Sequence, residues 1–166
     1  MYLSLNLPTL QLEKIKWHQD KIIDKSSNTT INLDGKLGYW ACSVAESTYK
    51  KLQKIFPQEI ISNSNVLVQF LRASVNNHPH KDSYPWTFMY MLDDADGHTN
   101  LYNDEKEIIS SHVTKKGQWA LLKSWDWHSP ESISKDKIRK ALVVRIKKDY
   151  GLDYFKQNFP EIKNVA

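Results

Sequence analysis

The segment IRKALVVRIKK, residues 138–148, carries the clearest strand pattern in the chain. Successive side chains of a strand point to opposite faces of a sheet. One face would present Ile138, Lys140, Leu142, Val144 and Ile146, and the other would present Arg139, Ala141, Val143 and Arg145. The pattern predicts the last strand of a β-rich core, with two arginines on the same face.

Upstream of this segment, apolar stretches alternate with turn signals at short intervals. The stretches NVLVQFLRASV (65–75), WTFMYML (86–92) and QWALLKSW (118–125) are rich in β-branched and aromatic residues, which predicts strands. Turn-forming residues separate them, in DDADG (93–97) and at Gly117, which ends SHVTKKG. Strands at such short intervals predict an antiparallel sandwich or barrel.

The N-terminal part differs from the rest of the chain. Its first 40 residues are polar and predict irregular structure. Ser43 stands three residues before Glu46, the spacing of a capping box, and Pro57 would end the helix that begins there. We expect this helix to pack outside the sheet. The prediction is one domain, 1–166, made of an irregular part and helix (1–63), a β core (64–148) and a C-terminal tail (149–166).

Composition restricts the class of protein. The chain has 166 residues and a formal net charge of +4, which suits one globular domain. Its lysines alternate with acidic residues, so a solvated surface is favoured over a nucleic-acid interface. The single cysteine, Cys42, excludes an intrachain disulfide. With no apolar run of about 20 residues and no basic leader, we expect a cytoplasmic protein without a membrane span.

The stretch NNHPHKDSYPW, residues 76–86, raises the question of a metal site. His80 and Asp82 are two residues apart, so on an extended segment both side chains point the same way. His128, just after QWALLKSWDW, is the best candidate for a third ligand. Two histidines and one carboxylate form the facial triad of non-haem iron(II) oxygenases. Zinc accepts similar ligands, and His78 is an alternative to His80.

Arg139 follows the candidate third ligand and begins the last predicted strand. If its side chain faces inward, its forked cation would bind a carboxylate near the metal. If it faces outward, it would mark the exposed end of the strand and pair with Asp136 or another acid. Spacing alone leaves both alternatives open.

In combination, these elements resemble the 2-oxoglutarate/Fe(II)-dependent dioxygenase superfamily, with a prolyl-hydroxylase-like pattern. The resemblance covers about residues 64–148 and rests on an ordered series of stretches: VQFLRASVNNHPHKD, WTFMYMLDDADGHTNLY, VTKKGQWALLKSWDWHSPE and RKALVVRIK. It implies a mainly β fold with flanking helices, the double-stranded β-helix, a cupin-like jelly-roll. It also implies that His80, Asp82 and His128 are the catalytic and metal residues, and that Arg139 holds the distal carboxylate of 2-oxoglutarate.

The same resemblance implies Fe(II), 2-oxoglutarate and O2 as reactants, with release of succinate and CO2 and with ascorbate as a reductant. Halogenating relatives replace the carboxylate ligand with a small residue, so Asp82 favours hydroxylation. The chain departs from the family where relatives place a cosubstrate-binding tyrosine and, two residues after the arginine, a serine. Met91 and Ala141 stand at these positions, and the resemblance implies that they contact the cosubstrate there. The chain also carries Gly97–His98 where many relatives have two glycines.

The substrate class stays open between a small molecule and a peptide. Thr87, Met89 and Met91 are expected to face any pocket, while Arg72 and Arg145 are expected at the surface or the rim. Two competing hypotheses of function remain. One is a cupin-like metal-binding protein or isomerase that uses no 2-oxoglutarate. The other is a structural jelly-roll in which the histidines are incidental.

Overall fold

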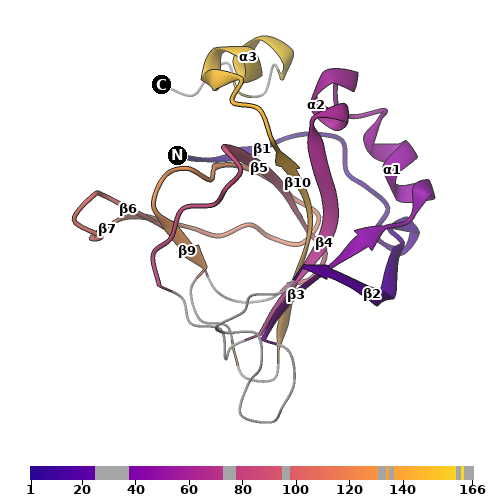
Figure 1. Ribbon diagram of the computed structural model, residues 1–166, viewed down its shortest axis with the longest axis horizontal. Coiled ribbons are helices and arrows are strands. Elements are labelled where there is room, and N and C mark those ends of the chain that lie inside the picture. Colours follow the sequence, from indigo (N-terminus) through magenta and orange to yellow (C-terminus); the bar gives the residue numbers. More distant parts are fainter. Residues whose placement is uncertain are drawn as a thin grey trace.

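A computed structural model describes residues 1–24, 38–72, 78–94, 98–130, 134, 137–159 and 162. These residues form two antiparallel sheets (Figure 1). The large sheet has the order β1 (Tyr2–Leu5), β8 (Trp119–Lys123), β5 (Trp86–Met91), β10 (Ile138–Ile146), β4 (Ser64–Arg72), β3 (Tyr39–Val44), β2 (Trp17–Asp24). The small sheet has the order β7 (Ile108–His112), β6 (Thr99–Tyr102), β9 (His128–Pro130).

One face of the large sheet packs against helices. These are α1 (Glu46–Leu52), α2 (Gln58–Ser62) and α3 (Gly151–Asn158) (Figure 1). A short 3-10 turn, η1 (Leu12–Lys14), lies between β1 and β2 in the chain. Leu142, Val144 and Ile146 of β10 are fully buried on this side. They belong to the same apolar cluster as Leu52 of α1 and Phe155 of α3. This cluster is the main core of the molecule.

The opposite face of the large sheet looks toward the small sheet. A second apolar cluster lies there and includes Met89 and Met91 of β5, Ala141 and Val143 of β10, and Leu101 of the small sheet. The two sheets therefore enclose an interior, and helices cover the outside of the larger one. This is the predicted mainly β, jelly-roll arrangement with flanking helices.

The strand predictions in the second half of the chain are confirmed. The four predicted strands correspond to β4, β5, β8 and β10. The alternation in the last strand also holds, because Leu142 and Val144 lie in the helix-side core and Ala141 and Val143 in the interior cluster. The predicted turn at Gly117 is present, with φ of 77° and its N–H donating to the Met91 carbonyl oxygen at 2.9 Å.

The prediction of an irregular N-terminal part is wrong. The first 44 residues contribute β1, β2 and β3 to the large sheet. β1 pairs with β8, Tyr2 opposite Leu122, and β3 pairs with β4. In the short β1 strand, Leu3 and Leu5 join the helix-side core and Tyr2 joins the interior cluster. The strand is thus held by burial on both faces and by a distant pairing partner.

The helix prediction is correct in place but not in its boundaries. Ser43 belongs to β3, where it pairs with Leu67, so the expected capping box does not form and Ala45 is the N-cap. The helix ends at Leu52, and Pro57 is the N-cap of the separate helix α2. None of the helices in the described part of the chain has the length and apolar character that a membrane crossing requires.

The segment predicted as a C-terminal tail packs into the core. It contains α3, and its Phe155, Phe159 and Ile162 are buried with the apolar residues of the large sheet. The 93–97 turn lies partly outside the described residues, and so does most of the 129–137 loop, including Asp136.

A buried hydroxyl on β5 holds the segment that follows β1. The Tyr90 hydroxyl donates to the Leu10 carbonyl oxygen at 2.9 Å and accepts from the Leu10 N–H at 3.1 Å. Substituting Tyr90→Phe would leave both backbone groups unpaired, so we expect the free energy of unfolding to fall by about 1–3 kcal/mol. Urea denaturation measures this. Tyr49→Phe, a partly buried tyrosine on α1, is the control and should change stability far less.

Candidate active site

The interior between the sheets contains a cavity of about 1090 Å³. Its described lining includes residues of β3, β4, β5, β10 and the small sheet, together with the loop that carries residues 78–84. The three candidate metal ligands and Arg139 all line this one cavity. The structure therefore brings together side chains that are far apart in the sequence.

A pair of backbone hydrogen bonds joins the two candidate histidine ligands. The His80 N–H donates to the His128 carbonyl oxygen and the His128 N–H donates to the His80 carbonyl oxygen, each at 2.9 Å. The two imidazole rings lie 4.5 Å apart between centroids. Asp82 is held next to them, because its N–H donates to the Ser124 carbonyl oxygen at 2.9 Å. Backbone bonds thus fix the positions of all three residues.

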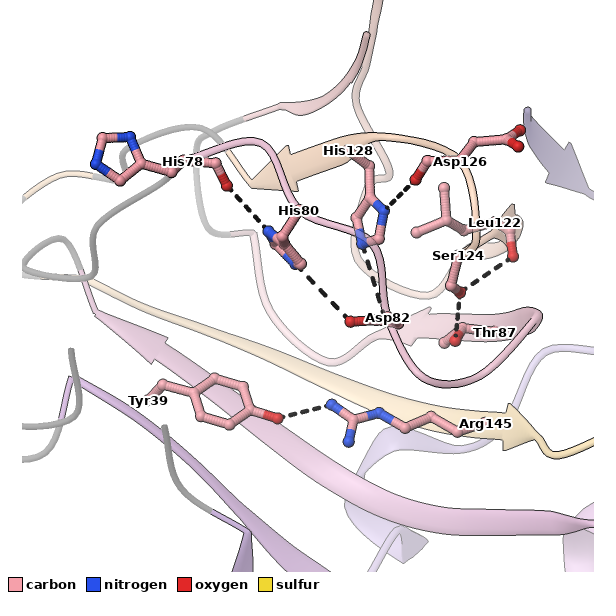
Figure 2. Close-up of polar contacts among 10 residues, drawn as sticks. All are labelled: Tyr39, His78, His80, Asp82, Thr87, Leu122, Ser124, Asp126, His128 and Arg145. Atoms are coloured by element: carbon pink, nitrogen blue, oxygen red, sulfur yellow. Dashed lines mark hydrogen bonds and ion pairs between the residues drawn. The ribbon is translucent and has the colours of Figure 1, made fainter. Parts of the chain in front are cut away.

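The side chains converge on one point, as Figure 2 shows. The Asp82 carboxylate lies 3.8 Å from His80 Nε2 and 3.7 Å from His128 Nε2. One ligand atom from each of the three residues lies within 4.8 Å of the other two. Metal–ligand bonds of about 2.0–2.2 Å would join such atoms to one ion after small side-chain rotations. The geometry suits a facial set of two histidines and a carboxylate.

Hydrogen bonds also orient both imidazole rings. His80 Nδ1 lies 3.0 Å from the His78 carbonyl oxygen, and His128 Nδ1 lies 2.9 Å from the Asp126 carbonyl oxygen (Figure 2). A carbonyl oxygen only accepts, so in each neutral ring Nδ1 carries the proton and Nε2 keeps its lone pair. Both lone pairs face the Asp82 carboxylate. Such backbone support is typical of histidines that bind metals.

Burial differs sharply across the three candidate ligands. The side chain of His128 is 6% exposed, that of Asp82 30% and that of His80 47%. Burial lowers the pKa of His128, and the neighbouring Asp82 carboxylate partly opposes this effect. A neutral imidazole with a free lone pair is the form that binds a metal. The site is therefore closed behind His128 and open beside His80.

Arg139 faces inward, which decides between the two alternatives that its spacing left open. It is 9% exposed, lines the cavity, and donates from Nη2 to the Thr99 hydroxyl at 3.0 Å. Burial lowers the pKa of Arg139, while Tyr2 and Asp93 oppose the shift. A guanidinium stays protonated in such surroundings because its intrinsic pKa is so high. The cavity therefore holds a buried, permanently charged donor.

Tyr2 is a candidate site residue that the sequence did not reveal. Its ring stacks on His112 at 4.5 Å, and His112 pairs across the small sheet with Thr99, the partner of Arg139. Its buried hydroxyl has no hydrogen-bond partner within the described part of the chain. Burial raises the pKa of Tyr2 to about 12, and Arg139 partly offsets this rise. The neutral phenol therefore lies within electrostatic reach of the buried Arg139 guanidinium, but Tyr2 is not among the described residues that line the cavity.

The two positions where the chain departs from the family pattern have different surroundings. Ala141 lines the cavity, whereas Met91 is almost fully buried in the interior cluster and is not among the described lining residues. Contact of either residue with a cosubstrate stays a prediction. Thr87 and Met89 line the cavity as expected.

The remaining histidines and tryptophans lie outside the triad. The His78 ring is exposed and points away from the triad, and only its carbonyl oxygen supports His80 (Figure 2). Trp125 is 45% exposed. Trp127 is partly buried between Lys81 and Lys106, whose ammonium groups lie 4.9 Å from its ring. Neither tryptophan is among the described residues that line the cavity.

The two arginines expected at the surface or rim have separate positions. Arg72 lies over the Trp40 ring at 5.5 Å. Arg145 is partly buried in the cavity wall, where it donates to the Tyr39 hydroxyl at 2.7 Å. Arg145 therefore belongs to the interior more than the sequence suggested, because Arg139 and Ala141 on the same face of β10 also line the cavity.

Comparisons with known proteins support the fold. No family model and no curated protein matches the chain. Among solved structures, it is similar to a prolyl hydroxylase from Trichoplax adhaerens in complex with a hypoxia inducible factor peptide fragment, at 16% identity and a TM-score of 0.52, over 82% of this chain and 71% of that one. The likeness confirms the double-stranded β-helix; at this identity it shows the fold alone.

Two further structures are more distant. An oxidoreductase of the 2OG-Fe(II) oxygenase family from Burkholderia pseudomallei matches at 10% identity and a TM-score of 0.41, over 63% of this chain and 53% of that one. Procruciferin, an 11S globulin from Brassica napus, matches at 9% identity and a TM-score of 0.44, over 78% of this chain and 28% of that one. The chain spans about half of the Burkholderia protein and less of the globulin. Neither likeness is strong enough to carry an argument about this chain, and its function must be argued from the site.

The geometry of the triad leads to a test of metal binding. Replacing His80, Asp82 or His128 with alanine removes one of three converging ligands, so we expect the affinity for Mn(II), an oxygen-stable substitute for Fe(II), to fall at least about 100-fold. Electron paramagnetic resonance titration of free Mn(II) measures this. His78→Ala keeps the carbonyl that orients His80 and should bind as the unaltered protein does. Equal affinity in all four variants would rule out the triad as the site.

Proposed function

We propose that this protein is a 2-oxoglutarate- and Fe(II)-dependent oxygenase that hydroxylates a small-molecule or peptide substrate and releases succinate and CO2. One observation carries the proposal. The two-histidine, one-carboxylate set and a buried inward arginine line the same cavity. Neither feature alone would suffice, since histidine clusters also serve zinc sites and buried arginines also serve structural roles.

His80, Asp82 and His128 would hold the iron on one side. Their arrangement leaves the opposite coordination positions for small ligands. Iron bound there would supply the redox chemistry by which O2 and 2-oxoglutarate are consumed, with ascorbate as an external reductant. The protein's part is to fix the ligands through the His80–His128 backbone bonds and to exclude water behind His128. The presence of Asp82 favours hydroxylation over halogenation.

The surroundings of Arg139 fit the distal carboxylate of 2-oxoglutarate. The guanidinium fork matches two carboxylate oxygens, and a bound anion would add to the favourable effect of Asp93 on this buried cation. Thr99 already accepts from one guanidinium nitrogen and so fixes its direction. The unpartnered Tyr2 hydroxyl would donate to the same carboxylate. Tyr2 would thereby replace the tyrosine that relatives carry where this chain has Met91.

The principal alternative is a cupin-like metal-binding protein or isomerase that uses no 2-oxoglutarate. Such a protein would need the triad but would have no use for a buried arginine deeper in the cavity. The position of Arg139 therefore favours the oxygenase. The two functions separate in one measurement, the release of succinate from 2-oxoglutarate in the presence of Fe(II), ascorbate and O2.

Arg139 variants test the cosubstrate assignment. Arg139→Lys keeps the charge but loses the fork, so we expect the affinity for 2-oxoglutarate to fall about tenfold or more. Calorimetric titration of the Mn(II)-loaded protein under nitrogen measures the affinity. Lys140→Ala, the next residue on the opposite face of β10, is the matched control and should leave it unchanged. Wild-type protein that binds metal but not 2-oxoglutarate would exclude this function.

Substitution of Tyr2 tests the proposed 2-oxoglutarate site independently of Arg139. Tyr2→Phe should weaken 2-oxoglutarate binding about three- to tenfold through loss of one hydrogen bond to a charged group. The free protein should be as stable as before or more so, because a buried hydroxyl without a partner is removed. Thermal unfolding with and without 2-oxoglutarate measures both effects. A marked loss of stability in the free protein would show that the hydroxyl has a structural partner instead.

A further inference from the structure

Exposed apolar side chains gather on β7, an edge strand of the small sheet. Ile108 is 58% exposed, Ile109 is 65% exposed, and Val113, which follows the strand, is 51% exposed. Within the described part of the chain, β7 pairs with β6 alone. The hairpin of β6 and β7 projects from the side of the molecule, away from α1 and α2 (Figure 1). An edge strand with apolar side chains in water can pair with a strand of another chain.

The backbone of Ser111 presents both of its hydrogen-bonding groups to this edge. The N–H and C=O of His128 bond to His80, so they face away from β6. Hydrogen-bonded and non-hydrogen-bonded pairs alternate along antiparallel strands. Leu101 of β6, which pairs with His128, therefore turns its N–H and C=O toward β7, where it pairs with Ser110. The next residue of β7, Ser111, then points its N–H and C=O outward.

The charges at the two ends of β7 are opposite in sign. Glu105 and Glu107 precede the strand, Lys115 and Lys116 follow it, and all four residues are exposed. None of these four side chains makes an ion pair within the described part of the chain. Lys106 lies between the two acids in the sequence, but its ammonium group lies over a tryptophan ring, 4.9 Å from the ring centre. The segment is therefore complementary in charge to a second copy of itself that runs in the opposite direction.

A twofold axis at Ser111 brings these features into register. In an antiparallel pair centred there, the two copies of Ser111 would exchange N–H···O=C hydrogen bonds. Ile109 of each copy would lie opposite Val113 of the other. Glu107 of each copy would lie opposite Lys115 of the other. A contact of this kind is symmetric and closes after two copies, whereas a parallel pair would bring like charges together.

An irregularity in β7 limits how far the shared ladder can extend. Leu101 pairs with Ser110 but Tyr102 pairs with Ile108, which leaves Ile109 as an extra residue on β7. A bulge of this kind bends the strand and interrupts backbone pairing. The exposed side chains would therefore supply much of the contact. A small interface of this type is typical of a transient complex.

We propose that this protein self-associates through β7, and that its partner there is a second copy of the same chain, paired antiparallel about Ser111. The opposite edge of the small sheet is β9, which carries His128. The contact would thus lie at the edge of the small sheet away from the candidate metal ligand. The inference is independent of the proposed oxygenase function, because it uses no residue of the cavity lining.

Sedimentation velocity over a range of protein concentrations tests the self-association. We expect a monomer–dimer equilibrium with a Kd of about 1–100 µM. Ile109→Lys should weaken it at least about tenfold, because an apolar contact is lost and a charge is placed in the contact. Ile22→Lys is the matched control, since Ile22 is an exposed isoleucine on β2, the edge strand of the other sheet, and association should not change. Thermal unfolding checks that each variant is folded.

Two results of this experiment would overturn the proposal. One is an unaltered protein that stays monomeric up to about 1 mM, well above the expected Kd. The other is association that Ile22→Lys weakens as much as Ile109→Lys does, because the contact would then not be specific to β7.

Charge reversal tests the antiparallel register. Glu107→Lys or Lys115→Glu alone would place like charges opposite each other twice in each dimer, so each should weaken association about tenfold. The double variant restores opposite charges and should associate within about twofold of the unaltered protein. An equal mixture of the two single variants should form a mixed dimer for the same reason. If the double variant associates no better than the single variants, the proposed pairing is wrong.

Discussion

The candidate site depends on the reciprocal pair of backbone hydrogen bonds between His80 and His128. These bonds join the loop after β4 to strand β9 of the small sheet, and they set the distance between two imidazoles that the sequence separates widely. Main-chain bonds are independent of side-chain identity, so the ligands are positioned by the fold itself. The carbonyls of His78 and Asp126 then orient the rings. Precise placement of this kind is what a metal centre requires.

Strand β10 organises the rest of the interior. It lies between β5 and β4 in the large sheet, where both neighbours hold it. One of its faces completes the helix-side core, and the other carries Arg139, Ala141 and Arg145 along the cavity. A central strand is the stiffest part of a sheet, and groups mounted on it keep their spacing better than groups on loops. The two cations are therefore part of a rigid frame, while the loop with His80 and Asp82 closes over it.

Periodicity and spacing predicted the parts that local sequence determines. The alternation in β10 predicted which residues would share a face, and the His80–Asp82 spacing with His128 predicted the three ligands that converge. Patterns within a short segment did not predict the structure of residues that pair with distant parts of the chain. β1 is held by β8, which is distant from it in the sequence, so nothing near Tyr2 indicated a role. The capping-box signal at Ser43 lost to pairing with Leu67, because sheet hydrogen bonds and burial outweigh one cap.

The unequal exposure of the two histidines has a kinetic consequence. His128 lies behind the site and His80 stands at its mouth, so an ion can reach the ligands, or be stripped by a chelator, from one side without any opening of the jelly-roll. The candidate ligands can thus take up or release a metal ion while the chain stays folded. If a metal ion binds there, its exchange would then not require the protein to unfold.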